Sequence, residues 1–130
     1  MIINLTQHTA TAEQMKSGVT DLTGDAAAIV RHLLTFDDIP TGADMDYRAT
    51  KIAVIAGERL AAEDRDTDDT ERLAMIGGAP FFMTSLERAL RWADIRPVYA
   101  FSVRDSVEQP DGNGGVRKIN TFRHAGFVTP

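Results

Sequence analysis

The sequence predicts a single α/β domain whose mixed, mainly parallel sheet is flanked by helices and closes with a C-terminal antiparallel hairpin. Segments with helical periodicity separate the predicted strands, and strands joined through helices favour parallel pairing with a right-handed connection. A dense turn signal lies between two β-compatible segments, 98–107 and 116–127, and predicts the hairpin. Short apolar segments of strand length occur at residues 1–6, 72–76 and 98–104.

The first strand, residues 1–6, contains few polar residues, so we expect a central position with both faces covered. Thr11 and Gln14 then stand at the spacing of a capping box, which predicts a short helix that ends near Ser17. Residues 19–22 fit either a second short strand or a loop.

Three longer helices follow. Asp25 is a suitable N-cap for a helix over residues 26–34. Residues 43–62 carry one apolar stripe and form the longest predicted helix. Gly57 lies inside it and costs roughly 1 kcal/mol relative to alanine, for which a close helix–sheet contact is one explanation. Two glycines then turn the chain into a helix over residues 80–93, whose first position is a proline. Pro97 marks the exit from that helix.

Composition narrows the classes of function. The 130 residues suit one domain. The 14 basic and 19 acidic residues give a net charge of −5, which argues against a duplex-DNA binder. The absence of cysteine excludes disulfides, thiolate metal sites and cysteine nucleophiles. No segment is apolar enough to span a membrane, and the N-terminus lacks a secretion signal, so we expect a cytoplasmic protein.

Motifs for metal ions and for common cofactors are missing as well. The acidic segment 63–71 fails the calcium-loop pattern because Asp69 and Met75 occupy the places of its glycine and glutamate, so we expect a solvated loop. The chain contains no dinucleotide fingerprint, P-loop, nucleophile elbow or paired-histidine zinc motif. We therefore expect neither a metal nor a cofactor.

Polar residues follow three of the predicted strands. In an open α/β sheet, ligands bind beyond the carboxyl ends of the parallel strands, so these polar segments should converge on one rim. The candidate ligand-binding residues are Asn4, Thr6, Gln7, Gly77, Gly78, Phe81, Ser102 and Arg104.

His8 is the candidate catalytic residue, because histidine titrates near neutrality and transfers protons. The alternative is a surface histidine that hydrogen-bonds to Thr11 or to a backbone carbonyl. His124 lies in a basic segment together with Arg117 and Lys118, where a solvated strand edge is the expected environment.

The glycine turn and Arg104 offer anion-binding groups. The helix after Gly78 has no capping side chain, so the amides of Phe81 and Phe82 could bind an anion with help from the helix dipole. The alternative is a tight turn in which glycine permits close packing. Arg104 could pair with a phosphate or carboxylate ligand, or with a neighbouring acidic side chain.

The segment 3–14, Ile-Asn-Leu-Thr-Gln-His-Thr-Ala-Thr-Ala-Glu-Gln, resembles the start of small CRISPR-associated proteins of the Rossmann-like CARF group. These proteins open with a strand, a Ser/Thr-x-His segment and a Thr-x-x-Gln segment that leads into a helix. The resemblance implies an antiviral-defence protein, a symmetric dimer and binding of cyclic oligoadenylates at Asn4, Thr6, Gln7 and His8. Some members cleave this ring without metal, and His8 would then carry the proton.

We therefore expect a cytoplasmic, dimeric α/β domain that binds a small anionic or nucleotide-like ligand at the rim of its sheet. Metal-independent phosphodiester cleavage, as in a ring nuclease, is the most specific form of this expectation. Two alternatives remain open, namely a sensor or sequestering module without chemistry and a protein–protein adaptor, for instance from a mobile element. The adaptor predicts a broad apolar patch and no pocket at the rim.

Overall fold

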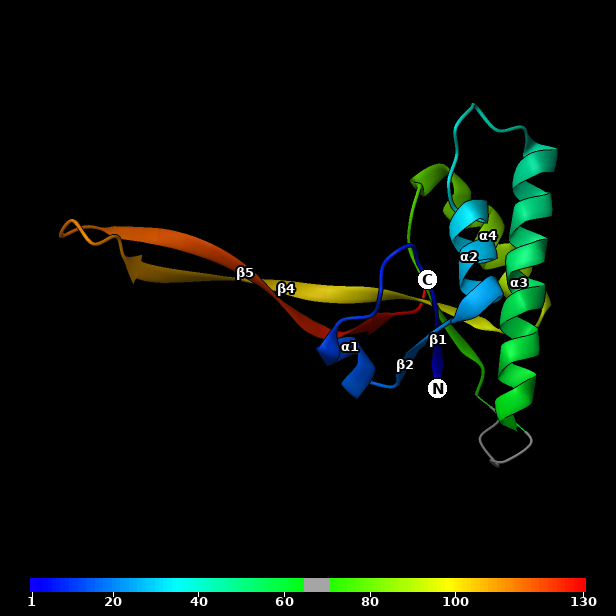
Figure 1. Ribbon diagram of the computed structural model, residues 1–130, viewed down its shortest axis with the longest axis horizontal. Helices are drawn as coiled ribbons and strands as arrows, with labels where there is room; N and C mark the ends of the chain where they lie inside the picture. The colour runs from blue at the N-terminus through cyan, green and yellow to red at the C-terminus, as the bar shows by residue number, and fades with distance from the viewer. Residues whose placement is uncertain (65–70) are drawn as a thin grey trace.

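The structure is a computed structural model that describes residues 1–64 and 71–130 (Figure 1). The acidic segment predicted as a solvated loop lies mostly outside these residues. The elements in chain order are β1 (Ile2–Leu5), α1 (Ala12–Lys16), β2 (Val19–Asp21), α2 (Gly24–Leu33), α3 (Gly42–Asp64), β3 (Leu73–Ile76), α4 (Pro80–Trp92), β4 (Arg96–Pro110) and β5 (Val116–Val128).

The strands form one mixed sheet in the order β2-β1-β3-β4-β5. β1 pairs in parallel with both β2 and β3, β3 pairs in parallel with β4, and β4 pairs antiparallel with β5. The predicted α/β fold class with a closing hairpin is confirmed, and the ambiguous segment 19–22 contributes strand β2. β1 is central and all four of its residues are buried, as its apolar composition predicted.

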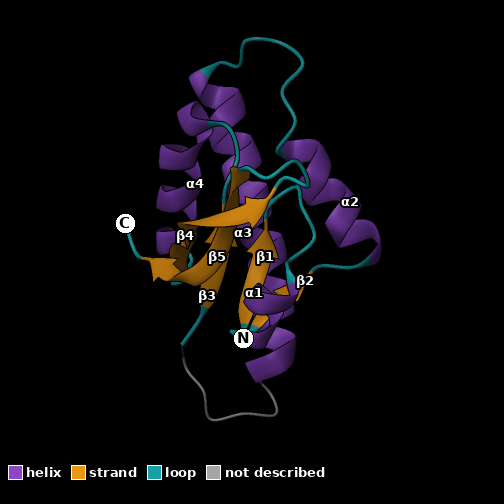
Figure 2. Ribbon diagram, turned by 90° about the vertical axis from the view of Figure 1, so that its left-hand side faces the viewer, coloured by secondary structure: helices purple, strands orange, loops and turns teal. Residues whose placement is uncertain are grey.

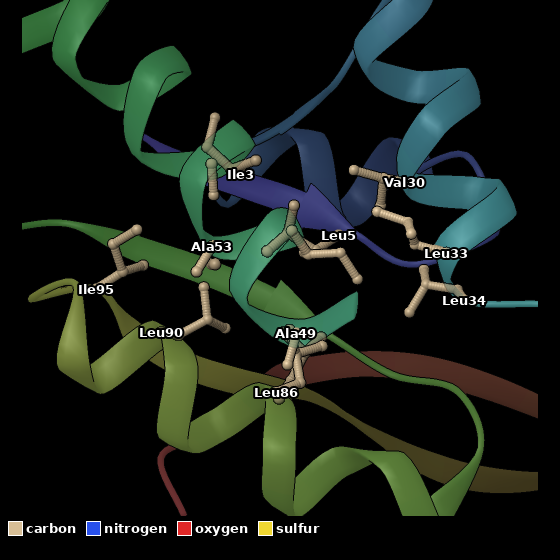
Figure 3. Close-up of a cluster of buried hydrophobic side chains, with 14 of the residues drawn as sticks. Ile3, Leu5, Val30, Leu33, Leu34, Ala49, Ala53, Leu86, Leu90 and Ile95 are labelled. Carbon is tan, nitrogen blue, oxygen red and sulfur yellow. The ribbon is translucent and has the colours of Figure 1, made fainter. Parts of the chain in front are cut away.

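The two faces of the sheet are covered unequally. α2, α3 and α4 cover one face, and the short α1 lies on the other (Figures 1 and 2). Side chains of a strand alternate between faces, so Ile3 joins the large core and Ile2 joins the small cluster on the opposite face. In the large core, residues of β1 pack against all three long helices, as for Leu5, Val30, Ala53 and Leu86 (Figure 3).

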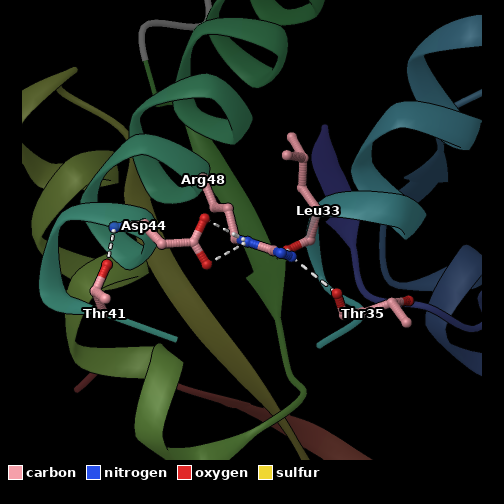
Figure 4. Close-up of polar contacts among 5 residues, drawn as sticks. All are labelled: Leu33, Thr35, Thr41, Asp44 and Arg48. Atoms are coloured by element: carbon pink, nitrogen blue, oxygen red, sulfur yellow. Dashed lines mark hydrogen bonds and ion pairs between the residues drawn. The ribbon is translucent and has the colours of Figure 1, made fainter. Parts of the chain in front are cut away.

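Arg48 joins the end of α2 to the first turns of α3 (Figure 4). Its Nη1 donates to the carbonyl oxygens of Leu33 and Thr35, at 3.0 and 2.8 Å, which satisfies acceptors that a helix end leaves open. Its Nε lies 3.1 Å from a carboxylate oxygen of Asp44, and the guanidinium stacks 4.4 Å from the Phe36 ring centroid.

Two local predictions are wrong. Asp25 lies inside the first turn of α2, and the N-cap is Thr23, whose carbonyl accepts from the amide of Ala27 at 3.4 Å. Gly57 is not explained by a close helix–sheet contact, because a Cβ atom built there meets no atom within 4 Å.

β4 continues far beyond the sheet. It pairs with β3 only from Arg96 to Val98, whereas its pairing with β5 extends from Tyr99 to Pro110. Residues 101–126, here called the arm, leave the rest of the chain, here called the body, as a long twisted ribbon (Figure 1).

Pro97 lies within β4 instead of marking the exit from α4. A proline lacks the N–H that a ladder requires, so it is tolerated near the start of a strand. The amide of Arg96 donates to Arg72, and pairing with β5 begins only at Tyr99, so no ladder hydrogen bond is lost at Pro97.

Phe82→Ala tests the core. The Phe82 side chain is fully buried, whereas its neighbour Phe81 is 54% exposed. We expect Phe82→Ala to lower the free energy of unfolding by about 3–5 kcal/mol, measured by urea denaturation. Phe81→Ala is the matched control, and its loss should stay below about 1.5 kcal/mol because it removes mainly an edge contact with Phe36. Equal losses would contradict this assignment of the core.

Candidate functional site

A cavity of about 400 Å³ lies at the carboxyl ends of β1, β3 and β4 and is here called the rim cavity. The segment after β1 lines it with Thr6, Gln7, His8 and Thr9, and the glycine turn lines it with Gly77 and Gly78. Thr11, Gln14 and Tyr99 also contribute to its wall. None of the lining residues, all within the described part of the chain, is Asp, Glu, Lys or Arg.

The Asn4 side chain holds the segment after β1 in place. Its Nδ2 donates to the His8 carbonyl at 2.8 Å and to the Asp21 carboxylate at 2.7 Å. Its Oδ1 accepts from the amide and the hydroxyl of Thr6, at 2.9 and 2.7 Å. Asn4 is therefore buried with its amide engaged, and it acts on the rim cavity by shaping the segment that lines it.

The His8 imidazole lines the rim cavity, and it differs from the side chains of Thr6 and Gln7 in its hydrogen bonding. The backbone of His8 is bonded to Asn4 and Thr6, but within the described residues its ring has no hydrogen-bond partner. The alternative hydrogen bond to Thr11 is not formed. The ring is therefore available as a donor or acceptor in the lining of the rim cavity.

A smaller hollow of about 60 Å³ lies beside the same segment. Asp21 and Arg31 line it together with Asn4 and His8. The Asp21 carboxylate accepts from Asn4 and from the amide of Ala10, at 2.7 and 3.0 Å. Thus Arg31, a cation on α2, shares this hollow with His8, although it was not among the predicted site residues.

The glycine turn brings the start of α4 close to the segment after β1. A Cβ atom at Gly77 would lie 3.5 Å from Cγ2 of Thr6, and Gly78 adopts φ +144°, which only glycine tolerates well. α4 has no side-chain cap. However, the Phe82 amide donates to the Ala79 carbonyl at 3.0 Å, so it is not free for an anion as predicted.

Four of the predicted site residues do not line the rim cavity, namely Asn4, which lies behind the segment that lines it, and Phe81, Ser102 and Arg104. Phe81 turns away and packs edge-on against Phe36, with ring centroids 5.1 Å apart. Ser102 and Arg104 lie on the arm opposite His124 and Phe122. Since Met75 is paired with Val98, the residues of β4 at the level of the rim are Tyr99 and Ala100. The predicted convergence of three polar strand ends therefore holds for β1 and β3 and is wrong for β4.

Thr11, Gln14 and Tyr99 are lining residues that the sequence analysis did not assign to the site. The capping box is confirmed. The backbone N–H of Gln14 donates to Oγ1 of Thr11 at 3.2 Å, and the backbone N–H of Thr11 donates to Oε1 of Gln14 at 3.0 Å. The Nε2 group of Gln14 keeps no partner within the described residues, so it is a donor available to the cavity. The sequence signal that could have identified Gln14 as a lining residue is the position of α1, which directly follows the segment after β1.

A family profile matches residues 1–128, almost the whole chain. The chain belongs to the uncharacterized protein MJ1673 family. Comparison with curated proteins and with solved structures found no match. The chemistry available to this MJ1673-family protein therefore has to be judged from its own residues.

Tyr99 is held on the helix side of the cavity. Its hydroxyl donates to the Glu87 carboxylate at 3.0 Å. Burial, the hydrogen bond to Glu87 and the charge of Glu87 together raise the pKa of Tyr99 to about 12, against an opposing effect of Arg91. The phenol therefore remains protonated near neutral pH and is bound to Glu87, so it is not a proton-transfer group for a ligand.

His124 is not at a solvated edge, as the sequence analysis expected. Both of its ring nitrogens are buried without a partner in the described structure, and the ring packs edge-on against Phe127 with centroids 5.0 Å apart. Its amide donates to the Glu13 carboxylate of α1 at 2.9 Å. The bulge between Phe101 and Ser102 re-aims the strand here, which turns His124 onto the small cluster.

The first prediction for the site concerns Asn4. We expect Asn4→Ala to lower the free energy of unfolding by about 1–3 kcal/mol, because it removes a buried amide and leaves partly buried hydrogen-bonding groups of Thr6, His8 and Asp21 without their partner. Asn120→Ala, at an exposed position of the arm, is the matched control and should change stability by less than about 0.5 kcal/mol. Urea denaturation measures both, and a similarly small loss for Asn4→Ala would contradict a structural role.

The second prediction concerns pH. The pKa of Tyr99 is higher in the folded state than its ordinary value of 10.0, so its contribution to stability is complete below pH 10 and is lost as pH rises through about 12. Thermal melting from pH 9 upward should therefore show a steeper loss for the wild type than for Tyr99→Phe. Parallel profiles for the two proteins would exclude the Tyr99–Glu87 contact as the cause.

Proposed function

We propose that this protein binds a small anionic or nucleotide-like ligand in the rim cavity. The observation that carries the proposal is the convergence of the segment Thr6–His8 with the Gly77–Gly78 turn around about 400 Å³ of space. This volume is within the range of small-molecule sites, and the carboxyl rim of a parallel sheet is where such folds bind ligands.

The lining groups suit a polar ligand. The Gln14 amide and the His8 ring have donors without partners, and the uncapped N-terminus of α4 begins directly after the glycine turn. With no carboxylate in the lining, an anion meets no repulsion from it, and the helix dipole adds a favourable field. Neutral donors and a dipole, with no fixed cation, favour an anion that also offers polar or aromatic groups, as a nucleotide does.

Turnover is the more specific part of this proposal. A metal-independent phosphodiester cleavage needs alignment of a ribose 2′-hydroxyl with the adjacent phosphate and a proton carrier, for which His8 is the candidate. The predicted arginine is not present in the cavity, because Arg104 lies on the arm. Arg31, which lines the smaller hollow beside His8, is the cation that could replace Arg104 in this role. The resemblance to the CRISPR-associated antiviral group supports the inclusion of cyclic oligoadenylates among the ligands to test.

Thermal melting against mononucleotides, dinucleotides and cyclic oligonucleotides tests the proposal. A ligand that binds only the folded state raises the melting temperature by mass action, so at a hundredfold excess over Kd we expect stabilisation of about 2.7 kcal/mol. Incubation followed by chromatography of the nucleotide then separates turnover from binding. No shift with any ligand at millimolar concentration would refute the nucleotide proposal.

Two histidine variants provide the control. His8→Ala should reduce the ligand-induced shift, or abolish turnover while binding remains, whereas His32→Ala on the exposed side of α2 should leave both unchanged. Arg104→Ala should also leave binding unchanged, because Arg104 is absent from the cavity lining. A loss of binding in Arg104→Ala with none in His8→Ala would place the ligand on the arm instead.

A second candidate function, the protein–protein adaptor, is favoured by the surface of α3 and α4. An apolar groove of about 450 Å³ runs between these helices beside Trp92, which is 92% exposed. Large exposed apolar side chains of this kind are typical of interaction surfaces. The melting experiment separates the two functions, since an adaptor predicts no shift with any nucleotide.

A further inference from the structure

The arm does not bury enough surface to be stable by itself. Beyond Phe101 most residues of both strands are exposed, including Val107, Val116 and Phe122, and Phe122 is 72% exposed. An isolated two-stranded ribbon is at best marginally stable in water. A ribbon that carries exposed valine and phenylalanine side chains therefore requires another surface to cover it.

Charge indicates what kind of surface this is. The arm has four basic and three acidic residues, a net charge of +1, which leaves −6 for the body because the whole chain carries −5. β5, the outer strand of the sheet, contains Arg117, Lys118 and Arg123 and no carboxylate. Of the three, Arg123 already forms an ion pair with Asp105 at 3.2 Å. Arg117 and Lys118 lie near the tip and make no ion pair within the described residues.

Nucleic acid fits the arm less well than an acidic protein surface. The arm keeps three carboxylates that phosphates would repel, and its most exposed large side chains are apolar. A nucleic-acid ribbon usually presents a cluster of unpaired cations to the phosphates. The arm instead combines a few cations with apolar side chains.

The body of the same chain carries a matching surface. The connector between α2 and α3 and the start of α4 form a groove of about 710 Å³, here called the connector groove. Asp37 and Asp38 supply carboxylates, and Ile39, which is 96% exposed, supplies an apolar wall together with Phe81. The arm of the same chain extends away from this connector (Figure 1), so it does not fill the groove.

We propose that the arm of one copy of this chain docks in the connector groove of a second copy, and that the arm of the second copy docks in the connector groove of the first. Because the arm and the groove belong to one chain, a two-fold axis satisfies both at once and gives a closed dimer. A strand rises about 3.3 Å per residue, so ten residues of β4 reach about 33 Å, enough to cross a domain of this size. The proposal is independent of any ligand in the rim cavity.

Sedimentation equilibrium tests it with the full chain. The wild type should form a species of twice 14.2 kDa at micromolar concentration, and high salt should weaken it because charges contribute. Phe122→Asp should raise the dimer dissociation constant at least about tenfold. A monomeric wild type, or a dimer unaffected by Phe122→Asp, overturns the proposal. So does a monomer that associates only after duplex DNA is added.

Charge reversal tests the docking site. The double variant Arg117→Glu/Lys118→Glu should weaken the dimer, and so should Asp37→Lys/Asp38→Lys, whereas an equimolar mixture of the two variants should associate again. Trp92→Asp, at an exposed site outside the connector groove, is the matched control and should keep the dimer. Circular dichroism confirms the fold of each variant. Loss of the dimer in Trp92→Asp alone, or no association in the mixture, overturns the proposal.

Discussion

The buried amide of Asn4 is the interaction on which the rim of the sheet depends. A polar side chain in a fully buried strand is costly unless each of its groups is hydrogen-bonded, and Asn4 meets this condition with Thr6, His8 and Asp21. The same bonds determine the path of the chain after β1 and connect it to β2. Thus the polar residue of the central strand also sets the position of the His8 backbone.

The molecule combines two ways of stabilising β-structure. In the body, β1 is covered on both faces, and the unequal layers of helices bury Ile3, Leu5 and Ile76 against Leu86 and Leu90. In the arm beyond His124, most residues are exposed, so hydrogen bonds between the two strands persist where apolar burial does not. Since burial of apolar surface is the dominant favourable contribution to folding, most of the stabilisation comes from the body and little of it from the arm.

The rim cavity and the arm are separate features, although β4 contributes to both. Tyr99 and Ala100 still lie at the sheet, and the bulge after Phe101 begins the segment that leaves it. An arginine only a few residues further along the same strand is therefore remote from the ligand site proposed here. The neutral lining that results is the physical reason for favouring dipoles and amide donors in the proposed binding.

Apolar periodicity and turn chemistry together were sufficient to predict the fold class, the central position of β1, the long helices and the closing hairpin, because both are local properties of the sequence. The capping box at Thr11 and Gln14 was predicted for the same reason. The polar residues that follow the predicted strands also indicated that His8 and the glycine turn lie at the rim of the sheet. Only the tertiary structure decided that Ser102 and Arg104 lie outside this site, because the register of β4 against β3 determines which residues reach the rim. Likewise, the exposure of the arm depends on how far β4 and β5 extend beyond the helices that cover the sheet, and no local pattern in the sequence determines that length.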